Sequence, residues 1–227
     1  MLCGLSVLQA RIPFSANLTD RRRERRVYQA GVKLWNGGVS RILPPREFRW
    51  KESLRRAGLA EVETAELCRA AAAPLVVEAL TLRGWEPGRS VVALAGERVS
   101  APLLRAAETL ARQVNCLQID IPAGGTELAE YLHEEYGLPV LLPGTVRPAL
   151  TAAFDESWKG RGAALRLWGE QPDLLGTEVW APGVELPPEC DPMPLLAALR
   201  DSGMLSDEGL RARPGRVPLE MTLDIPG

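Results

Sequence analysis

The hydrophobic and polar positions in the middle of the chain predict alternating strands and helices. Val91 to Ala95 is uniformly apolar, which is typical of a central parallel strand covered on both faces. A helical pattern follows, then a second strand over Leu117–Ile121, an amphipathic helix over Thr126–Tyr136, and a third strand over Pro139–Leu142. Two β-α-β crossovers in succession specify a parallel sheet.

The pattern also predicts elements before this core. Alternating residues in "VLQARIPF" indicate a strand with one buried face. A helix follows Thr19, a plausible N-cap, and stops at Gly37-Gly38, and the segment "VSRIL" indicates a short strand. A helix that is apolar nearly all round should run from Thr64 to Gly84 with a kink at Pro74.

Beyond Pro143 the pattern changes. Alternation at Leu150–Phe154 and Leu165–Leu167, with polar "DESWKGRG" between them, predicts an antiparallel hairpin at one edge of the sheet. A short helix should begin after the cap Asp191, and the alternation from Leu219 to Ile225 predicts a C-terminal strand. We expect this strand to pair within the chain, and the alternative is exchange between two subunits, which would make a homodimer.

Together these elements predict a three-layer Rossmann-like α/β fold, with a central parallel sheet and antiparallel edge strands. We expect a single domain over 1–227. It comprises a basic strand-helix-strand part at 1–60, a β-α-β core at 61–143, and an antiparallel edge with a C-terminal wrap at 144–227.

The composition argues against several classes of protein. Hydrophobic residues make up 46% of the chain, yet no apolar run approaches the ~20 residues of a membrane helix, so we expect no membrane span. Arg11 interrupts the apolar opening, so we interpret it as structure and not as a secretory signal. The four cysteines are far apart and His133 is the only histidine, so neither a disulfide framework nor a metal site is indicated. A cytoplasmic location is the simplest expectation.

The glycine turns after the first two strands have the layout of a nucleotide site. Gly96 follows the apolar strand, Ser100 opens the next helix, and Asp120 lies 24 residues after Gly96. Gly124 and Gly125 form a second glycine turn before Thr126. In dinucleotide-binding folds such turns lie close to the phosphates, and the acidic residue accepts hydrogen bonds from the ribose hydroxyls. The candidate cofactor-binding residues are therefore Gly96, Ser100, Asp120, Gly124, Gly125 and Thr126.

From Ser90 to Pro143 the chain resembles the Rossmann-like superfamily at the level of fold. The resemblance implies a nucleotide or another phosphorylated small molecule at the carboxyl ends of the strands. The turn "GERVS" departs from the G-x-G-x-x-G pattern, with one glycine and with Glu97 where a phosphate would approach. The alternative, which partial motifs favour, is that Gly96 only turns the chain and that Asp120 caps a nearby backbone N–H.

A second candidate is the run "TDRRRERR". Residues 1–50 hold ten Lys or Arg and three Asp or Glu, a net +7, which leaves −9 for the remainder of a chain with net charge −2. Arginines in the first turns of a helix oppose its dipole, so Arg22, Arg25 and Arg26 are candidates for an anionic partner. The alternative is that the acidic remainder or solvent balances them. Without aromatic residues between the arginines, the run does not favour nucleic acid.

The function predicted from sequence is thus a Rossmann-like protein that binds a nucleotide or another phosphorylated small molecule. The alternative is a non-catalytic interaction module that uses the basic helix and an edge containing Trp158, Trp168 and Trp180. No second catalytic group accompanies His133, so no reaction is predicted.

Overall fold

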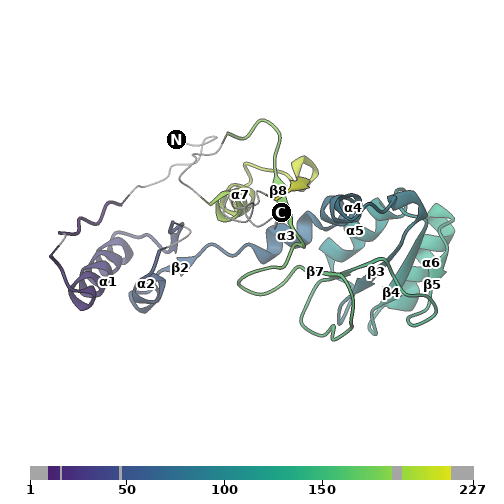
Figure 1. Cartoon of the computed structure of the whole chain (residues 1–227), viewed down its shortest axis with the longest axis horizontal. Helices are drawn as coiled ribbons and strands as arrows, with labels where there is room; N and C mark the ends of the chain where they lie inside the picture. The colour runs from purple at the N-terminus through teal and green to yellow at the C-terminus, as the bar shows by residue number, and fades with distance from the viewer. Residues whose placement is uncertain (1–9, 16, 46–47, 186–190, 216–227) are drawn as a thin grey trace, which may run out of the picture. The chain divides into compact units, whose positions relative to one another are not determined.

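The computed structural model describes residues 10–15, 17–45, 48–185 and 191–215. They form two compact units (Figure 1). The first, here the helical unit, comprises Met1–Glu63 and Gly183–Leu205, and the second, the sheet unit, comprises Thr64–Pro182 and Ser206–Gly227. The single domain predicted over 1–227 stays a prediction.

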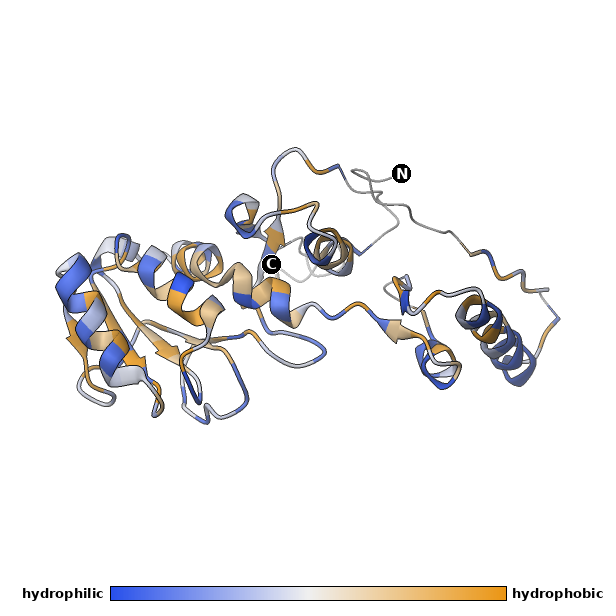
Figure 2. Cartoon of the chain, turned by 180° about the vertical axis from the view of Figure 1, so that it is seen from behind, coloured by the Kyte–Doolittle hydropathy of each residue, from blue (hydrophilic) through white to orange (hydrophobic). Residues whose placement is uncertain are grey.

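The sheet unit is built on a five-stranded parallel sheet with strand order β5-β4-β3-β6-β7. Its strands are β3 (Val91–Ala95), β4 (Cys116–Asp120), β5 (Val140–Leu141), β6 (Leu150–Ala153) and β7 (Ala164–Arg166). The predicted α/β class is confirmed, and so is the prediction that the first three strands are parallel neighbours. The strands are hydrophobic along most of their length (Figure 2).

The hairpin predicted over Leu150–Phe154 and Leu165–Leu167 is wrong. β6 pairs with β3 and β7 pairs with β6, and both pairs are parallel. Residues 154–163 separate β6 from β7, a connection longer than the two to five residues of most hairpin loops, and it returns the chain to the amino-terminal end of the sheet. After β5 the strand order therefore reverses, and β3 and β6 flank a topological switch point.

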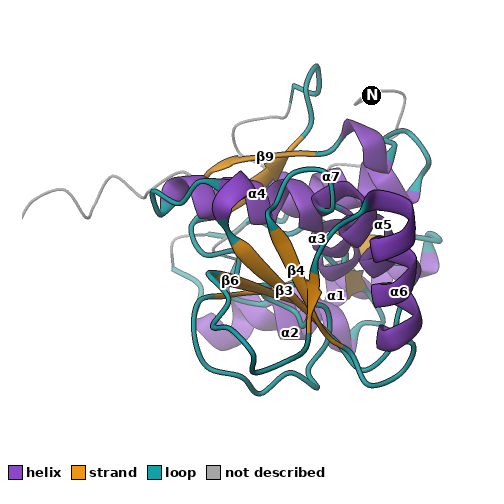
Figure 3. Ribbon diagram, turned by 90° about the vertical axis from the view of Figure 1, so that its right-hand side faces the viewer, coloured by secondary structure: helices purple, strands orange, loops and turns teal. Residues whose placement is uncertain are grey.

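The helices of the sheet unit are α3 (Ala65–Ala70), α4 (Ala72–Leu82), α5 (Ala101–Leu110) and α6 (Gly125–Tyr136). α5 contacts the other three, and Figure 3 shows all four on the same side of the strands. They form one helical layer, whereas the predicted three-layer arrangement needs helices on both faces. The connections that right-handed crossovers would place on the opposite face, 142–149 and 154–163, contain no helix.

The helix predicted from Thr64 to Gly84 with a kink at Pro74 is two helices that meet at Ala71. Pro74 lies in the first turn of α4, and its ring has no N–H to bond the carbonyl of Ala70. The break therefore lies one turn before the proline. Gly84, at a φ of +71°, ends α4 as predicted.

An antiparallel pair completes the sheet unit. β8 (Thr177–Trp180) pairs with β9 (Arg211–Pro214), and both strands pack against α4.

The helical unit contains α1 (Asp20–Asn36), β1 (Arg41–Ile42), α2 (Lys51–Arg56), β2 (Ala60–Glu61) and α7 (Pro192–Asp201). Thr19 precedes α1 and Asp191 caps α7, as predicted. α1 packs against α2 where Gly31 allows a close approach, since a Cβ there would lie 2.7 Å from Cβ of Ala57. Val27, Leu54 and Leu59 form the core of this contact.

The two predicted terminal strands fall largely outside the described residues. Residues 10–14 contain no strand, and the rest of "VLQARIPF" is not described. The strand predicted from Leu219 to Ile225 also lies outside, so intramolecular pairing and the homodimer stay predictions.

Candidate functional site

The turns after β3 and β4 lie side by side at the carboxyl edge of the sheet. The backbone N–H of Gly96 donates to the carbonyl of Asp120 at 3.3 Å. Further along, Val99 donates to Ala123 at 3.1 Å, and Ala123 donates to Glu97 at 3.2 Å. The predicted residues Gly96, Asp120 and Gly124 are thus brought together, and several backbone groups of the two turns are already bonded to one another.

The second glycine turn has a packing role. Gly124 precedes α6 at a φ of +83°, a conformation that favours glycine. A Cβ at Gly125 would lie 3.2 Å from side-chain atoms of both Ile119 and Ile121. Gly125 therefore lets α6 pack closely on β4, which accounts for this glycine without a ligand.

The polar residues predicted at this edge have different surroundings. Ser100 caps α5, and its Oγ accepts from the N–H of Leu103 at 3.4 Å. Thr126 is exposed in the first turn of α6. Asp120 is half-buried at the end of β4. Its carboxylate accepts no hydrogen bond from any residue in the described part of the chain, so the proposed backbone cap is not observed.

Asp155, which the sequence did not single out, occupies the switch point between β3 and β6. Its Oδ2 accepts from the backbone N–H of Glu97 at 2.8 Å, and its Oδ1 accepts from the N–H of Ser157 at 3.0 Å and from the Ser157 hydroxyl. A Cβ at Gly96 would lie 3.1 Å from Oδ2. The carboxylate thus lies where a phosphate-binding turn would present its free N–H groups.

Asp155 is held in its charged form. Burial alone would raise its pKa, but hydrogen bonds from Ser157 and Glu97, with the nearby Arg69 guanidinium, lower the pKa below the usual value. Arg69 also donates to the carbonyl of Phe154 at 3.3 Å and pairs with Glu66. A phosphate at the Gly96 turn would therefore meet the Asp155 carboxylate.

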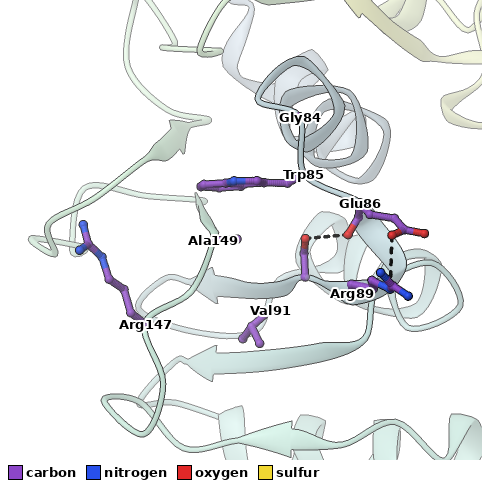
Figure 4. Close-up of a pocket in the computed structure, with 8 residues that line it drawn as sticks. Gly84, Trp85, Glu86, Arg89, Val91, Arg147 and Ala149 are labelled. Atoms are coloured by element: carbon purple, nitrogen blue, oxygen red, sulfur yellow. Dashed lines mark hydrogen bonds and ion pairs between the residues drawn. The ribbon is translucent and has the colours of Figure 1, made fainter.

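A pocket of about 360 Å³ lies at the opposite, amino-terminal ends of β3 and β6 (Figure 4). Its position is fixed by the backbone bond from Ala149 to Val91 at 2.9 Å, which joins the starts of the two strands. The lining residues are Gly84, Trp85, Glu86, Arg89, Ser90, Val91, Arg147 and Ala149.

The pocket, here the Trp85 pocket, combines an aromatic ring with cations. Trp85 is 40% exposed, and Figure 4 shows its ring near Ala149, with Arg147 and Arg89 on either side of Val91. Arg89 pairs with Glu86 at 3.4 Å, whereas Arg147 has no ion pair or hydrogen bond with the residues that are described. This end of the sheet can therefore receive a negative charge beside an apolar ring.

Sequence reasoning missed the Trp85 pocket, although one signal was present. "RGWEPG" places a tryptophan between the glycine that ends α4 and a Pro-Gly turn that leads into β3. An aromatic residue in so short a connection has few neighbours to bury it, so exposure was predictable. The contribution of Arg147 was not, because it depends on β6 lying beside β3.

The predicted basic run lies on α1 of the helical unit. Arg23 pairs with Asp20 at 3.4 Å, and Arg26 donates to the carbonyl of Pro13 at 3.2 Å. Arg22 and Arg25 are exposed, and neither has a partner among the described residues. Glu24 pairs with Arg56 on α2 and so compensates none of these exposed charges.

The three tryptophans predicted as an interaction edge lie in different surroundings. Trp180 donates from Nε1 to the carbonyl of Ala212 at 3.3 Å, and Trp158 lies against Gly160 in its own loop. Trp168 is half-buried, and its Nε1 has no hydrogen-bond partner in the described part of the chain. Cys68 was not predicted as a site residue, and burial raises its pKa to about 12, so this thiol is unreactive at neutral pH.

Metal-binding clusters and membrane-spanning helices are both absent from the residues that the structure describes. No group of three or more His, Cys, Asp or Glu side chains there is placed to hold a metal ion. Within the same ranges, every helix is too short or too polar to cross a membrane.

Comparison with known proteins does not identify a family for this chain. No family model matches the chain, and no curated protein matches it. Among solved structures it is similar to L-tryptophan dehydrogenase from Nostoc punctiforme, with 16% sequence identity and a TM-score of 0.32, over 60% of this chain and 40% of that one. A likeness at this TM-score supports no conclusion about fold or ligand, and the fold described above rests on the strand pairing.

Proposed function

We propose that this chain binds a small anionic ligand that carries a planar ring, such as a nucleotide, in the Trp85 pocket. The observation that carries the proposal is that the pocket is lined both by the half-exposed Trp85 ring and by Arg147, whose guanidinium has no partner among the described residues. Nucleotides are the ligand class that the sequence pattern predicts.

Each part of such a ligand has a suitable partner there. The flat face of a base or another heterocycle can stack on the indole, which is energetically favourable beyond the apolar area that it covers. The guanidinium of Arg147 can bind a phosphate or carboxylate through two parallel N–H groups. Arg89 adds positive charge, part of which Glu86 compensates.

The glycine turns at the carboxyl edge are the alternative location. Ligands of open parallel sheets generally bind there, and Asp120 would accept hydrogen bonds from ribose hydroxyls. Against this location stand the Asp155 carboxylate on the Glu97 N–H and the side chain of Glu97 itself, since both repel a phosphate. The charge distribution therefore favours the Trp85 pocket.

Isothermal titration with ATP, GTP, NAD and FMN tests the proposal, with thermal shift as a second readout. A ligand at 100 times its Kd should stabilise the chain by about 2.7 kcal/mol. We expect Trp85→Ala and Arg147→Gln to weaken binding at least tenfold, and Asp120→Asn and the control Arg161→Gln to leave it unchanged. Loss of binding in Asp120→Asn alone would place the ligand at the glycine turns, and no binding by any of the four ligands would overturn the proposal.

A second function, binding of an anionic partner by α1, is favoured by one observation. Arg21, Arg22 and Arg25 are exposed and have no partner in the described ranges, although they lie at the end of the helix where cations are least stable. An external anion would relieve that repulsion. The test is the salt dependence of binding to a polyanion, which should flatten when these arginines become glutamine.

A further inference from the structure

The exposed face of α1 carries aromatic rings as well as arginines. Arg21, Arg25, Tyr28, Val32 and Trp35 follow one another at spacings of four, three, four and three residues, which places them on one side of a helix. The stripe is about 21 Å long at 1.5 Å per residue. We call it the α1 stripe, and Arg22 lies in the row next to it.

The two rings are exposed and not part of the core. Tyr28 is 41% exposed and Trp35 is 50% exposed, whereas Val27 and Gly31 on the adjoining face of α1 are buried against α2. α1 is hydrophilic over most of its surface (Figure 2).

Trp35 is positioned as a platform. Three atoms at the ring fusion of its indole lie 3.1 to 3.4 Å from where a Cβ of Gly58 would be, so one face of the ring rests on this glycine. Trp35 is 50% exposed, so part of its indole is open to solvent. Gly58 has a φ of +95°, so a side chain at that position would be strained as well as in contact with the ring.

The charge of α1 complements a polyanion. The helix has six basic and two acidic residues, a net +4, and one of the acids, Glu24, is bonded to Arg56 and Ser53 of α2. Three guanidiniums at one end of the stripe can contact phosphates, and the rings at the other end can contact bases.

We propose that the α1 stripe binds single-stranded nucleic acid, with phosphates on Arg21, Arg22 and Arg25 and unpaired bases stacked on Tyr28 and Trp35. The proposal rests on the second proposed function, that α1 holds an anionic partner. An acidic protein surface would use the arginines but has no need of exposed rings, and in a duplex the base faces are not available for stacking.

The probe is a fluorescein-labelled oligo(dT) of about 20 nucleotides, titrated with the full chain and followed by anisotropy. Three phosphate contacts predict a slope of log K against log salt near −2, which is about a 20-fold loss of affinity from 50 to 200 mM salt. R21Q/R22Q/R25Q should flatten this slope. The control R83Q/R112Q/R161Q removes the same charge from exposed positions of the sheet unit and should keep it.

Stacking is tested by Trp35→Leu and Tyr28→Leu. Each should weaken oligo(dT) binding about tenfold without changing the salt slope, and Trp35→Phe should recover part of the affinity. Tyr28→Leu keeps the test valid if Trp35→Leu disturbs the contact with Gly58, and far-ultraviolet circular dichroism verifies that α1 is intact.

Two further probes separate the inference from the function on which it rests. We expect polyglutamate and a duplex of the same length to bind at least tenfold more weakly than oligo(dT). Equal binding of polyglutamate or duplex, with both leucine variants unaffected, would overturn the nucleic-acid inference and leave α1 as a general anion surface. No binding of any probe would overturn both.

Discussion

Replacement of Asp155 by alanine removes a carboxylate that joins the loop after β6 to the turn after β3. It deletes the acceptor for the Glu97 N–H at 2.8 Å, for the Ser157 N–H at 3.0 Å and for the Ser157 hydroxyl. Hydrogen bonds to charged groups contribute about 1.5 to 3 kcal/mol each when buried, and less where water can replace the lost partner. Asp155 is half-buried, so we expect a total loss of about 2 kcal/mol.

The assay is thermal unfolding followed by circular dichroism. For a chain of this size a loss of 2 kcal/mol lowers the Tm by about 4 to 8 °C. Glu156→Ala is the matched control, because it removes the adjacent, exposed carboxylate. A Tm of Asp155→Ala within about 1 °C of that control would refute the role assigned to this carboxylate.

The dependence on pH gives a second check. Because the folded chain lowers the pKa of Asp155, its stabilisation is fully present above the unfolded pKa of about 3.9 and is lost as the pH falls through the folded value. The difference in unfolding free energy between wild type and Asp155→Asn should therefore be constant near neutral pH and shrink below about pH 4. A difference that grows on acidification would contradict the lowered pKa.

Three other predictions concern packing and reactivity. Gly125→Ala should destabilise the sheet unit by about 1 to 3 kcal/mol in urea unfolding, because its Cβ would lie 3.2 Å from Ile119 and Ile121, whereas Gly88→Ala, with open space around it, should not. Gly31→Ala should destabilise the α1–α2 contact by a similar amount in the same assay, since Ala57 would lie 2.7 Å away, and unchanged stability would contradict that contact. Cys68 should resist a thiol reagent in the folded chain at pH 8, because its pKa is about 12, and rapid labelling at wild-type stability would contradict its burial.

The central sheet was predictable because its signals are local. Uniformly apolar β3, the serine cap of α5 and the glycine that ends α6 each follow from a few neighbouring residues. The pairing of β6 was not predictable in this way, because strand order depends on contacts far apart in sequence. Alternation in "LTAAF" was interpreted as a half-buried edge, yet all four residues of β6 are buried in the sheet.

The same distinction between local signals and long-range contacts applies to the candidate sites. Gly96 and Asp120 were correctly placed on neighbouring strands, but only the structure brings Asp155 beside Gly96 and Arg147 beside Trp85. The α1 stripe was missed for a different reason. The arginines and the rings are separate in sequence, and helical spacing places them on one face.

The most direct test of the proposed function is a titration of the ¹⁵N-labelled chain with the tightest-binding nucleotide, followed through its backbone amide and indole resonances. Binding in the Trp85 pocket predicts the largest shifts at the Trp85 indole and at the amides of Arg89, Val91 and Arg147. The amides of Gly96, Glu97 and Gly124 should stay unchanged. Shifts concentrated on those three amides, with the Trp85 indole unmoved, would contradict the proposal and return the ligand to the carboxyl edge of the sheet.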